Sequence, residues 1–348
     1  MPGFRELITQ RDHAKARELL EAAGLELPEG VTFGLGYYED GSLAGAGFLA
    51  GNILCGICIS PFQRGIGLAS GIVSRLIQHA SARGIHKLLL FTSREEMPKF
   101  QELGLKLVAQ SPHAALLEFG QPDCSAWLEH MCGVIQQQRQ AMPSVSFQNA
   151  AAGAIVMNAN PFTRGHLHLV RTALESCTYV YVFVVEEDAS AFPFSVRLAL
   201  VRQGLAPYPQ AVVLPAGPYM VSQASFPAYF TGKATHSSVH AELDSTIFAV
   251  RIAKALGIGA RFIGQEPYCE VTARYNAALK EILPQHGVAC VEIDRLGSDA
   301  GAISASRVRE LLAGPNTNIA WSALQKLVPE TTLSFLQSDA MQDIRKAL

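Results

Sequence analysis

The sequence predicts an α/β protein of two domains, the second of which contains a doubly wound parallel sheet. The chain has 348 residues, more than one hydrophobic core usually serves. Hydrophobic residues make up 49% and charged residues 17% of it, as is typical of compact globular proteins. After residue 150, apolar runs of strand length alternate with amphipathic helical segments. That alternation is the pattern of a parallel sheet covered by helices.

The bulk composition excludes several classes of partner. The formal net charge of -2 gives no electrostatic reason to bind nucleic acid or an anionic membrane. The N-terminus has no apolar stretch of signal-peptide type, and no uninterrupted apolar run is long enough to span a bilayer. Seven cysteines, an odd and scattered set, favour reduced thiols. We therefore expect a cytoplasmic protein with no nucleic-acid partner and no membrane partner.

Residues 1–140 are predicted to form the first domain. A helix is expected over 11–24, where apolar residues recur on one face and Gly24 ends the pattern. Asp40-Gly41 lies between two alternating segments, which is a strong signal for a β-hairpin. A polar linker is expected over 141–151. The remaining expected elements are strands at 31–38, 43–49, 53–59, 87–91, 106–109 and 114–119 and helices after residue 69 and over 95–103 and 124–139.

A glycine-containing loop, Arg64-Gly65-Ile66-Gly67-Leu68-Ala69, joins the expected strand 53–59 to the next helix. Backbone N–H groups at such a junction can bind an anion. The loop resembles the Arg/Gln-x-x-Gly-x-Gly/Ala loop of the GCN5-related acetyltransferases, which holds the pyrophosphate of coenzyme A. The resemblance implies an acetyltransferase-like α/β fold and a site for a coenzyme A-like arm at Arg64, Gly65, Gly67 and Ala69. Because no residue of this domain stands out as an acetyl-transfer base, a degenerate fold kept for binding or packing stays open.

Cys55 and Cys58 lie three residues apart in the expected strand 53–59. Side chains three apart on a regular strand point to opposite faces of the sheet. We therefore expect this pair neither to chelate a metal nor to form a redox disulfide.

Residues 152–348 are predicted to form the second domain. In a doubly wound sheet the ligand binds at the carboxyl ends of the strands. The tail from residue 321 is expected to be helical and divided by Pro329. The expected strands are 154–157, 179–185, 211–214, 261–264 and 288–293, and the expected helices begin near residue 165 and cover 195–205, 239–256 and 273–283.

The segment 155–170 has the strongest pattern in the chain. An apolar strand is interrupted by Asn158-Ala-Asn160-Pro161, and a helix begins near Gly165. A strand, a tight loop and a helix start direct backbone N–H groups at an anion. Thr163 and His166 place a hydroxyl and an imidazole at the helix entrance, and Gly165 lets a phosphate or an adenine approach the backbone.

Thr163-Arg164-Gly165-His166 resembles the (His/Thr)-x-Gly-His signature of the nucleotidylyltransferase superfamily. Ile303-Ser304-Ala305-Ser306-Arg307-Val308-Arg309 resembles its second signature, Ile-Ser-Ser-Thr-x-(Ile/Val)-Arg. With the acetyltransferase-like first domain, further segments make the chain similar to the [citrate (pro-3S)-lyase] ligase family over nearly its full length. The resemblance implies a Rossmann-like second domain. The sequence departs from the family pattern at 229–233, where the family has a shorter Tyr-Phe-Leu-Lys, and this departure leaves the role of Lys233 in doubt. The further segments that carry the resemblance are 160–166, 187–197, 225–230, 261–267 and 271–276.

The resemblance implies a specific reaction. ATP and acetate give acetyl-adenylate and pyrophosphate, and the acetyl group passes to the thiol of the phosphoribosyl-dephospho-coenzyme A arm on the acyl-carrier (gamma) subunit of citrate lyase. It implies that His166, Thr163 and Arg309 are catalytic and that Ser304 and Ser306 bind the phosphates that leave. Mg²⁺ is expected to be held mainly by phosphate oxygens, so no side chain is assigned as a metal ligand.

Supporting roles are expected for other residues of the same motifs. Nucleotide-binding or loop-holding roles fall to Asn158, Asn160, Phe162, Gly165, Arg197, Gly264 and Glu266. For Arg197 a solvated salt bridge is the alternative. His168 is roughly 200° round the helix from His166 and is not expected to share its site. His236, His240 and Asp244 could share a helix face, but surface histidines are favoured over a zinc site because no third metal ligand has suitable spacing.

Three other functions stay open. The same chemistry could serve the carrier protein of malonate decarboxylase, or the chain could adenylate a phosphomonoester such as phosphopantetheine or a nicotinamide phosphate. A non-catalytic carrier-binding or regulatory protein is the alternative from another class. Pyrophosphate exchange that depends on acetate would separate the ligase from the second and third of these.

Overall fold

The computed structural model describes residues 2–27, 30–65, 67–140, 152–186, 190–220, 232–266, 270–298, 301–313 and 320–345, with only the backbone at 232–237, 271, 298, 301 and 302. The chain divides into two compact units, Met1–Glu129 with Phe226–Ile247 and His130–Ser225 with Phe248–Leu348. The expected linker 141–151, Glu187, Asp188 and the segment 225–230 lie outside the described residues. The predicted domain boundary stays a prediction.

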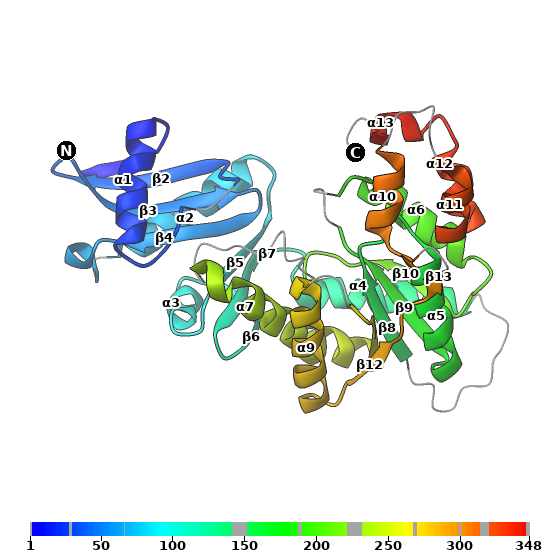
Figure 1. Ribbon diagram of the computed structural model, residues 1–348. Helices are drawn as coiled ribbons and strands as arrows, with labels where there is room; N and C mark the ends of the chain where they lie inside the picture. The colour runs from blue at the N-terminus through cyan, green and yellow to red at the C-terminus, as the bar shows by residue number, and fades with distance from the viewer. Residues whose placement is uncertain are drawn as a thin grey trace. The chain divides into compact units, whose positions relative to one another are not determined.

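The first unit contains a seven-stranded sheet with the order β1-β2-β3-β4-β5-β7-β6 (Figure 1). The predicted hairpin is confirmed: β2 and β3 pair antiparallel, and Asp40 and Gly41 both have positive φ. The sequence pattern does not predict β1, a strand of only four residues. The elements are β1 (Gly3–Glu6), α1 (Gln10–Glu21), β2 (Phe33–Glu39), β3 (Ser42–Ala50), β4 (Ile53–Ile59), η1 (Pro61–Gln63), α2 (Leu68–Ala82), β5 (Lys87–Ser93), α3 (Met97–Glu102), β6 (Lys106–Gln110), β7 (Ala114–Gly120) and α4 (Cys124–Gln140), whose last part belongs to the second unit.

A β-bulge in β4 overturns the argument about Cys55 and Cys58. Cys58 pairs with Ala46 and Cys55 with Phe48, so two residues of β4 oppose one residue of β3. The extra residue reverses the alternation of side chains, and both thiols pack in the same buried cluster against α1. Burial raises the pKa of Cys55 to about 12 and also raises the pKa of Cys58. The two thiols contact different backbone carbonyls and are free cysteines.

A helix from the second half of the sequence completes the first unit. The sequence predicts one helix over 239–256, and the structure divides this stretch into α7 (Gly232–Ile247), a π-helical turn η2 (Phe248–Ala253) and α8 (Lys254–Leu256). Helix α7 packs on β6 and β7. The carboxylate of Glu242 accepts hydrogen bonds from the backbone N–H of His113 at 3.2 Å and from its ring at 2.9 Å. Helix α7 ends at Ile247, and the chain passes to the second compact unit at the next residue, Phe248.

The second unit contains an all-parallel five-stranded sheet with the order β10-β9-β8-β11-β12, as the doubly wound prediction requires. The chain winds outward from β8 in one direction and then returns to start again at β11. The neighbouring strands β8 and β11 therefore mark the topological switch point. The elements are β8 (Ala152–Met157), α5 (Arg164–Ser176), β9 (Tyr179–Val184), α6 (Phe194–Leu205), β10 (Ala211–Pro215), β11 (Ile258–Gly264), α9 (Glu270–Gln285), β12 (Ala289–Ile293), the short strands β13 (Gly297–Ser298) and β14 (Gly301–Ala302), α10 (Ala305–Leu312), α11 (Trp321–Leu327), α12 (Glu330–Leu336) and α13 (Met341–Arg345).

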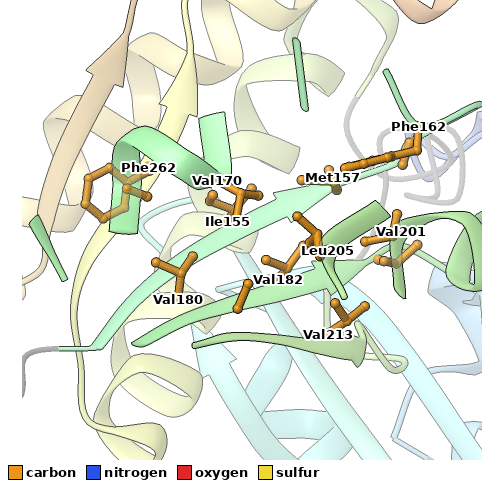
Figure 2. Packing of buried hydrophobic residues seen from close by; sticks show 14 of the residues in the cluster. Ile155, Met157, Phe162, Val170, Val180, Val182, Val201, Leu205, Val213 and Phe262 are labelled. Atoms are coloured by element: carbon orange, nitrogen blue, oxygen red, sulfur yellow. The ribbon is translucent and has the colours of Figure 1, made fainter. Parts of the chain in front are cut away.

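The second unit has two clusters of buried hydrophobic side chains. β9 is buried along its whole length, as a central parallel strand should be. Figure 2 shows Val180 and Val182 of β9 among side chains from β8, β10, α5 and α6. A second buried cluster joins α10 to the C-terminal helices α11–α13, and Pro329 separates α11 from α12 as predicted. Among the described residues, no helix combines the length and apolarity needed to cross a bilayer.

Candidate functional site

A cavity of about 350 Å³ lies at the switch point of the second unit. Its walls come from the carboxyl ends of β8, β11 and β12 and from the starts of α5 and α10, which is where a doubly wound sheet binds its ligand. The cavity brings together most of the residues predicted for the site. Those that line it are Asn158, Asn160, Thr163, Gly165, His166, Gly264, Glu266, Ser304, Ser306 and Arg309.

Thr163 and His166 form a reciprocal cap at the start of α5. The Thr163 hydroxyl accepts a hydrogen bond from the backbone N–H of His166 at 3.4 Å. The backbone N–H of Thr163 donates to His166 Nδ1 at 3.0 Å. Because Nδ1 accepts this bond, the proton of a neutral imidazole sits on Nε2. The cap therefore sets both the orientation and the tautomer of His166.

The electrostatic surroundings keep His166 neutral. Burial of the imidazole and, secondarily, the positive charge of Arg295 lower the pKa of His166 to about 4 from the ordinary 6.5. The ring also stacks on Phe162, with the centroids 5.8 Å apart and the planes 15° from parallel. At neutral pH the residue can donate a hydrogen bond from Nε2, but it carries no charge.

Phe162 is not among the described residues that line the cavity, and its ring contacts His166, which does line it. The Phe162 side chain is fully buried in the core of the second unit. A Cβ added at Gly204 would lie 2.5 Å from the Phe162 ring, so the ring fills the space that this glycine leaves. Phe162, predicted as a nucleotide-binding residue, is placed to support the His166 ring through this stacking contact.

Arg197 is likewise absent from the described residues that line the cavity. Its side chain is fully buried, which contradicts the alternative of a solvated salt bridge. The guanidinium donates to the backbone oxygens of Asn158, Val185 and Phe192 at 2.7 to 3.0 Å, and to the side-chain oxygen of Asn158 at 2.7 Å. A buried arginine with four acceptors holds irregular backbone in one shape. The same loop includes Ala159, whose φ of +50° a residue with a Cβ rarely adopts.

Arg309 ties the second motif to the first. Its guanidinium donates to the backbone oxygen of Asn160 at 2.5 Å and to the Ser306 hydroxyl at 3.1 Å. Burial lowers its pKa from the ordinary value. Ser304 caps α10 by accepting a hydrogen bond from the N–H of Arg307 at 3.1 Å. Hydroxyls and a cation thus gather at the start of α10, as the motif predicts.

Two glycines, Gly165 and Gly264, line the cavity with bare backbone. A Cβ at Gly165 would lie 3.4 Å from the carbonyl oxygen of Ile303, so the starts of α5 and α10 approach each other there. A Cβ at Gly264 would meet no atom within 4 Å, so the end of β11 faces open space. The amide of Asn276 holds that strand end by donating to the Gly264 oxygen at 3.0 Å.

Arg295 is a residue of the cavity that the sequence pattern does not predict. This residue follows β12, lines the cavity and donates from Nε to the Gln265 oxygen at 2.8 Å, and it forms an ion pair with Glu266. A signal was present, because Asp294 and Arg295 follow an apolar strand at its carboxyl end. The partner could not be identified without the pairing of β11 with β12, which brings Glu266 beside Arg295.

Two predictions about histidines are wrong. His168 lines the same cavity as His166, because the cavity extends along the first turns of α5. His240, expected on the surface, is buried at 3% exposure together with Asp244, because α7 packs on the seven-stranded sheet of the first unit.

The side chains of Lys233 and His236 lie outside the described residues. Among the side chains that the structure describes, no three His, Cys, Asp or Glu gather to hold a metal ion.

A second cavity, of about 580 Å³, lies in the first unit. The parallel strands β4 and β5 pair only through Ile53–Leu89 and Leu54–Leu90, and the cavity is lined by the residues that follow on both strands. The predicted loop residues Arg64, Gly65, Gly67 and Ala69 line it as well. The N-cap of α2 is Gly67, with φ of +77° and no side-chain cap. Backbone N–H groups at this helix start are therefore available to a ligand.

Comparisons with known proteins cover nearly the whole chain. The profile of the citrate lyase ligase C-terminal domain matches residues 152–336. The chain is 36% identical over 310 residues to the [citrate [pro-3S]-lyase] ligase of Klebsiella pneumoniae, covering 88% of this chain and 86% of that protein. It is 32% identical over 345 residues to the ligase of the same name from Haemophilus influenzae, covering 96% and 98%. The structure of an acyl-CoA N-acyltransferase from Pseudomonas aeruginosa is 16% identical with a TM-score of 0.30, and it matches 34% of this chain and 100% of that one.

Proposed function

Because the chain belongs to the citrate lyase ligase family, we propose that it is an AMP-forming acid–thiol ligase that acetylates the carrier of citrate lyase. ATP and acetate would give acetyl-adenylate and pyrophosphate. The thiol of the carrier's coenzyme A-like arm would then take the acetyl group and release AMP. The observation that carries the proposal is the convergence of both nucleotide motifs on one cavity at the switch point of the second sheet.

In the first step an acetate oxygen attacks the α-phosphorus of ATP. The bond from that phosphorus to the oxygen bridging to the β-phosphate breaks, and pyrophosphate leaves. Negative charge builds on the non-bridging oxygens, and donors held in place before the reaction stabilise it. Neutral His166 suits this role, because its cap with Thr163 leaves Nε2–H as the donating group. The first N–H groups of α5 add the positive end of the helix dipole.

The leaving pyrophosphate would be received at the start of α10. Ser304, Ser306 and Arg309 supply two hydroxyls and a cation on this side of the cavity. Arginine binds phosphate oxygens through a planar set of donors. Arg295 adds a second cation beside His166, with its charge balanced by Glu266.

Magnesium bound with ATP would neutralise charge on the leaving group. The donors of the cavity fit an ion held mainly by phosphate oxygens, because the carboxylates among its described lining residues are Glu266 and Asp294, and Glu266 already pairs with Arg295. The chain's own part is to orient the phosphates through Ser304, Ser306 and Arg309.

In the second step the carrier thiol attacks the acetyl carbonyl. The carbon–oxygen bond to AMP breaks, the thioester forms, and the thiol proton goes to solvent. We propose that the cavity beside Arg64 and Gly67 holds the pantetheine-nucleotide arm of the carrier. Its support is a helix start without a side-chain cap, which can receive the arm's phosphates.

Acetate-dependent exchange of labelled pyrophosphate into ATP tests the proposal. We expect exchange by the full chain, and a loss of about 100- to 1,000-fold in the exchange rate for His166→Ala, as for the removal of one preorganised donor. His286→Ala, which changes an exposed histidine of the same unit, is the control and should exchange at the original rate.

Two results would contradict this function. Exchange that needs a phosphomonoester rather than acetate would identify an adenylyltransferase, and failure to bind ATP would favour a non-catalytic carrier-binding protein. The deacetylated carriers of citrate lyase and malonate decarboxylase, supplied in parallel, decide the acceptor. We expect acetylation of the citrate lyase carrier.

A further inference from the structure

The second residue of the Thr163-Arg164-Gly165-His166 motif faces away from the cavity. Thr163, Gly165 and His166 line the cavity, and Arg164 is not among its described lining residues. The Nε of Arg164 instead donates to the backbone oxygens of Gln325 at 3.3 Å and Val328 at 3.1 Å. The motif therefore has an inner side that meets the cavity and an outer side that meets the C-terminal helices.

The two carbonyls that Arg164 contacts belong to the end of α11. Val328 is the C-cap of this helix, and Gln325 lies in its last turn. The last carbonyls of an α-helix have no partner within the helix, and a cationic side chain can satisfy them. One guanidinium at the first position of α5 thus fastens the end of α11.

Helix α11 in turn supports α10, which carries the second motif. Ile303, Val308 and Leu312 of the α10 segment pack in one buried cluster with Leu324 and Leu327 of α11. Figure 1 shows these helices in orange and red, and contacts join α10 to α11 and α11 to α5. The start of α10 holds Ser304, Ser306 and Arg309 at the cavity.

We propose that Arg164 is a positioning residue that fixes α11, and through it α10, against α5. It would act with two ties inside the cavity, which are the bond from Arg309 to the Asn160 oxygen and the close approach of Gly165 to the Ile303 oxygen. The inference rests on the proposed function, because it gives Arg164 a part in holding the groups that receive pyrophosphate. Arg164 itself touches neither ATP nor acetate.

The test uses the full-length Arg164→Met and Arg164→Lys variants. ATP affinity is measured by calorimetry without acetate, and kcat and KM for pyrophosphate are measured in the exchange reaction. We expect Arg164→Met to weaken ATP and pyrophosphate binding by about 10-fold, in the range for coupling through a packed network. Arg164→Lys should recover most of this loss, since an ammonium can donate to the same two carbonyls. Arg171→Met, at an exposed position on the same helix, is the matched control.

The outcomes separate this inference from the proposed function. ATP and pyrophosphate binding unchanged in Arg164→Met would overturn the positioning role. An equal loss in Arg164→Lys and Arg164→Met, accompanied by an equal fall in unfolding temperature, would overturn it too, because a structural defect explains that pattern. If the unaltered chain binds ATP but shows no acetate-dependent exchange, the proposed function fails, and the calorimetric comparison still decides the role of Arg164.

Discussion

The two cavities of this protein both lie at strand-to-helix junctions, but the helices at these junctions are capped in different ways. Each lies where a parallel strand leads into a helix. In the first unit, the N-cap of α2 is Gly67, which forms no side-chain cap, and the loop contributes two glycines with positive φ. In the second unit, Thr163 is the N-cap of α5 and Ser304 the N-cap of α10, and the side chains of both residues accept a hydrogen bond from a backbone N–H of their own helix.

The difference shows what each cavity is suited to do. A helix start formed by glycine offers backbone N–H groups to an anion and supplies no capping side chain. At the start of α5, the backbone N–H of Thr163 donates to His166 Nδ1 and is therefore not free for a ligand. This bond orients the imidazole so that Nε2–H can act as a hydrogen-bond donor. The loop that leads to this cap includes Ala159 in the strained left-handed conformation. Buried Arg197 stabilises the loop by donating a hydrogen bond to the backbone oxygen of the preceding residue, Asn158.

The largest effect should come from Arg197→Met. The change leaves four oxygens at a buried position without their donor, and each unsatisfied acceptor costs about 1 to 3 kcal/mol, so the free energy of unfolding should fall by about 3 to 5 kcal/mol. Denaturant unfolding measures it, and Arg202→Met on the exposed side of the same helix is the control. Equal unfolding midpoints for the two variants would contradict the role of Arg197 as the support of the second cavity.

A smaller and more selective effect is expected from Gly67→Val. A branched residue at φ of +77° disturbs the α2 start, so KM for the acceptor carrier should rise by about 10-fold, the equivalent of roughly 1.4 kcal/mol. Under the proposed function, acetate-dependent exchange takes place in the second cavity, so its rate should not change. Gly84→Val provides the control, because Gly84 has the same φ at the other end of α2. An unchanged KM, or a KM raised equally by Gly84→Val, would remove the first cavity from the reaction.

The smallest effect concerns the pH dependence of stability. The folded pKa of His166 is about 4 and its ordinary value is 6.5, so the unfolded chain takes up the proton first as pH falls, and the folded state loses stability between about pH 7 and pH 4. Between pH 7 and pH 6 the unfolding free energy of the unaltered chain should fall by about 0.7 kcal/mol more than that of His166→Asn, which does not titrate. Parallel declines in denaturant unfolding would mean that His166 is not held neutral. His286→Asn should follow the unaltered chain.

Much of the second cavity could be predicted from local pattern. Thr163, His166 and Ser304 are polar residues at loop-to-helix junctions, and the parallel sheet brings such junctions to one edge. Arg197 and Arg295 could not be understood in this way. In the sequence each is one arginine in or beside a regular element, and its role depends on oxygens that lie up to 39 residues away along the chain.

The errors in the first unit have a similar cause. The pattern around Cys55 and Cys58 is that of a regular strand, and pairing with β3 introduces the bulge that turns both thiols to one face. His240 lies on a helix with a polar sequence, and its burial follows from the packing of α7 on a sheet whose strands come more than a hundred residues earlier.

The sequence by itself determined the alternation of strands and helices, the hairpin at Asp40-Gly41 and the two motifs of the second unit, because backbone preference and side-chain periodicity act over a few residues. Tertiary structure alone decided that Arg197 is buried, that Arg295 pairs with Glu266 and that Arg164 fastens α11. Those contacts join residues far apart in the chain, and only the folding of the sheet and the packing of its helices bring them together.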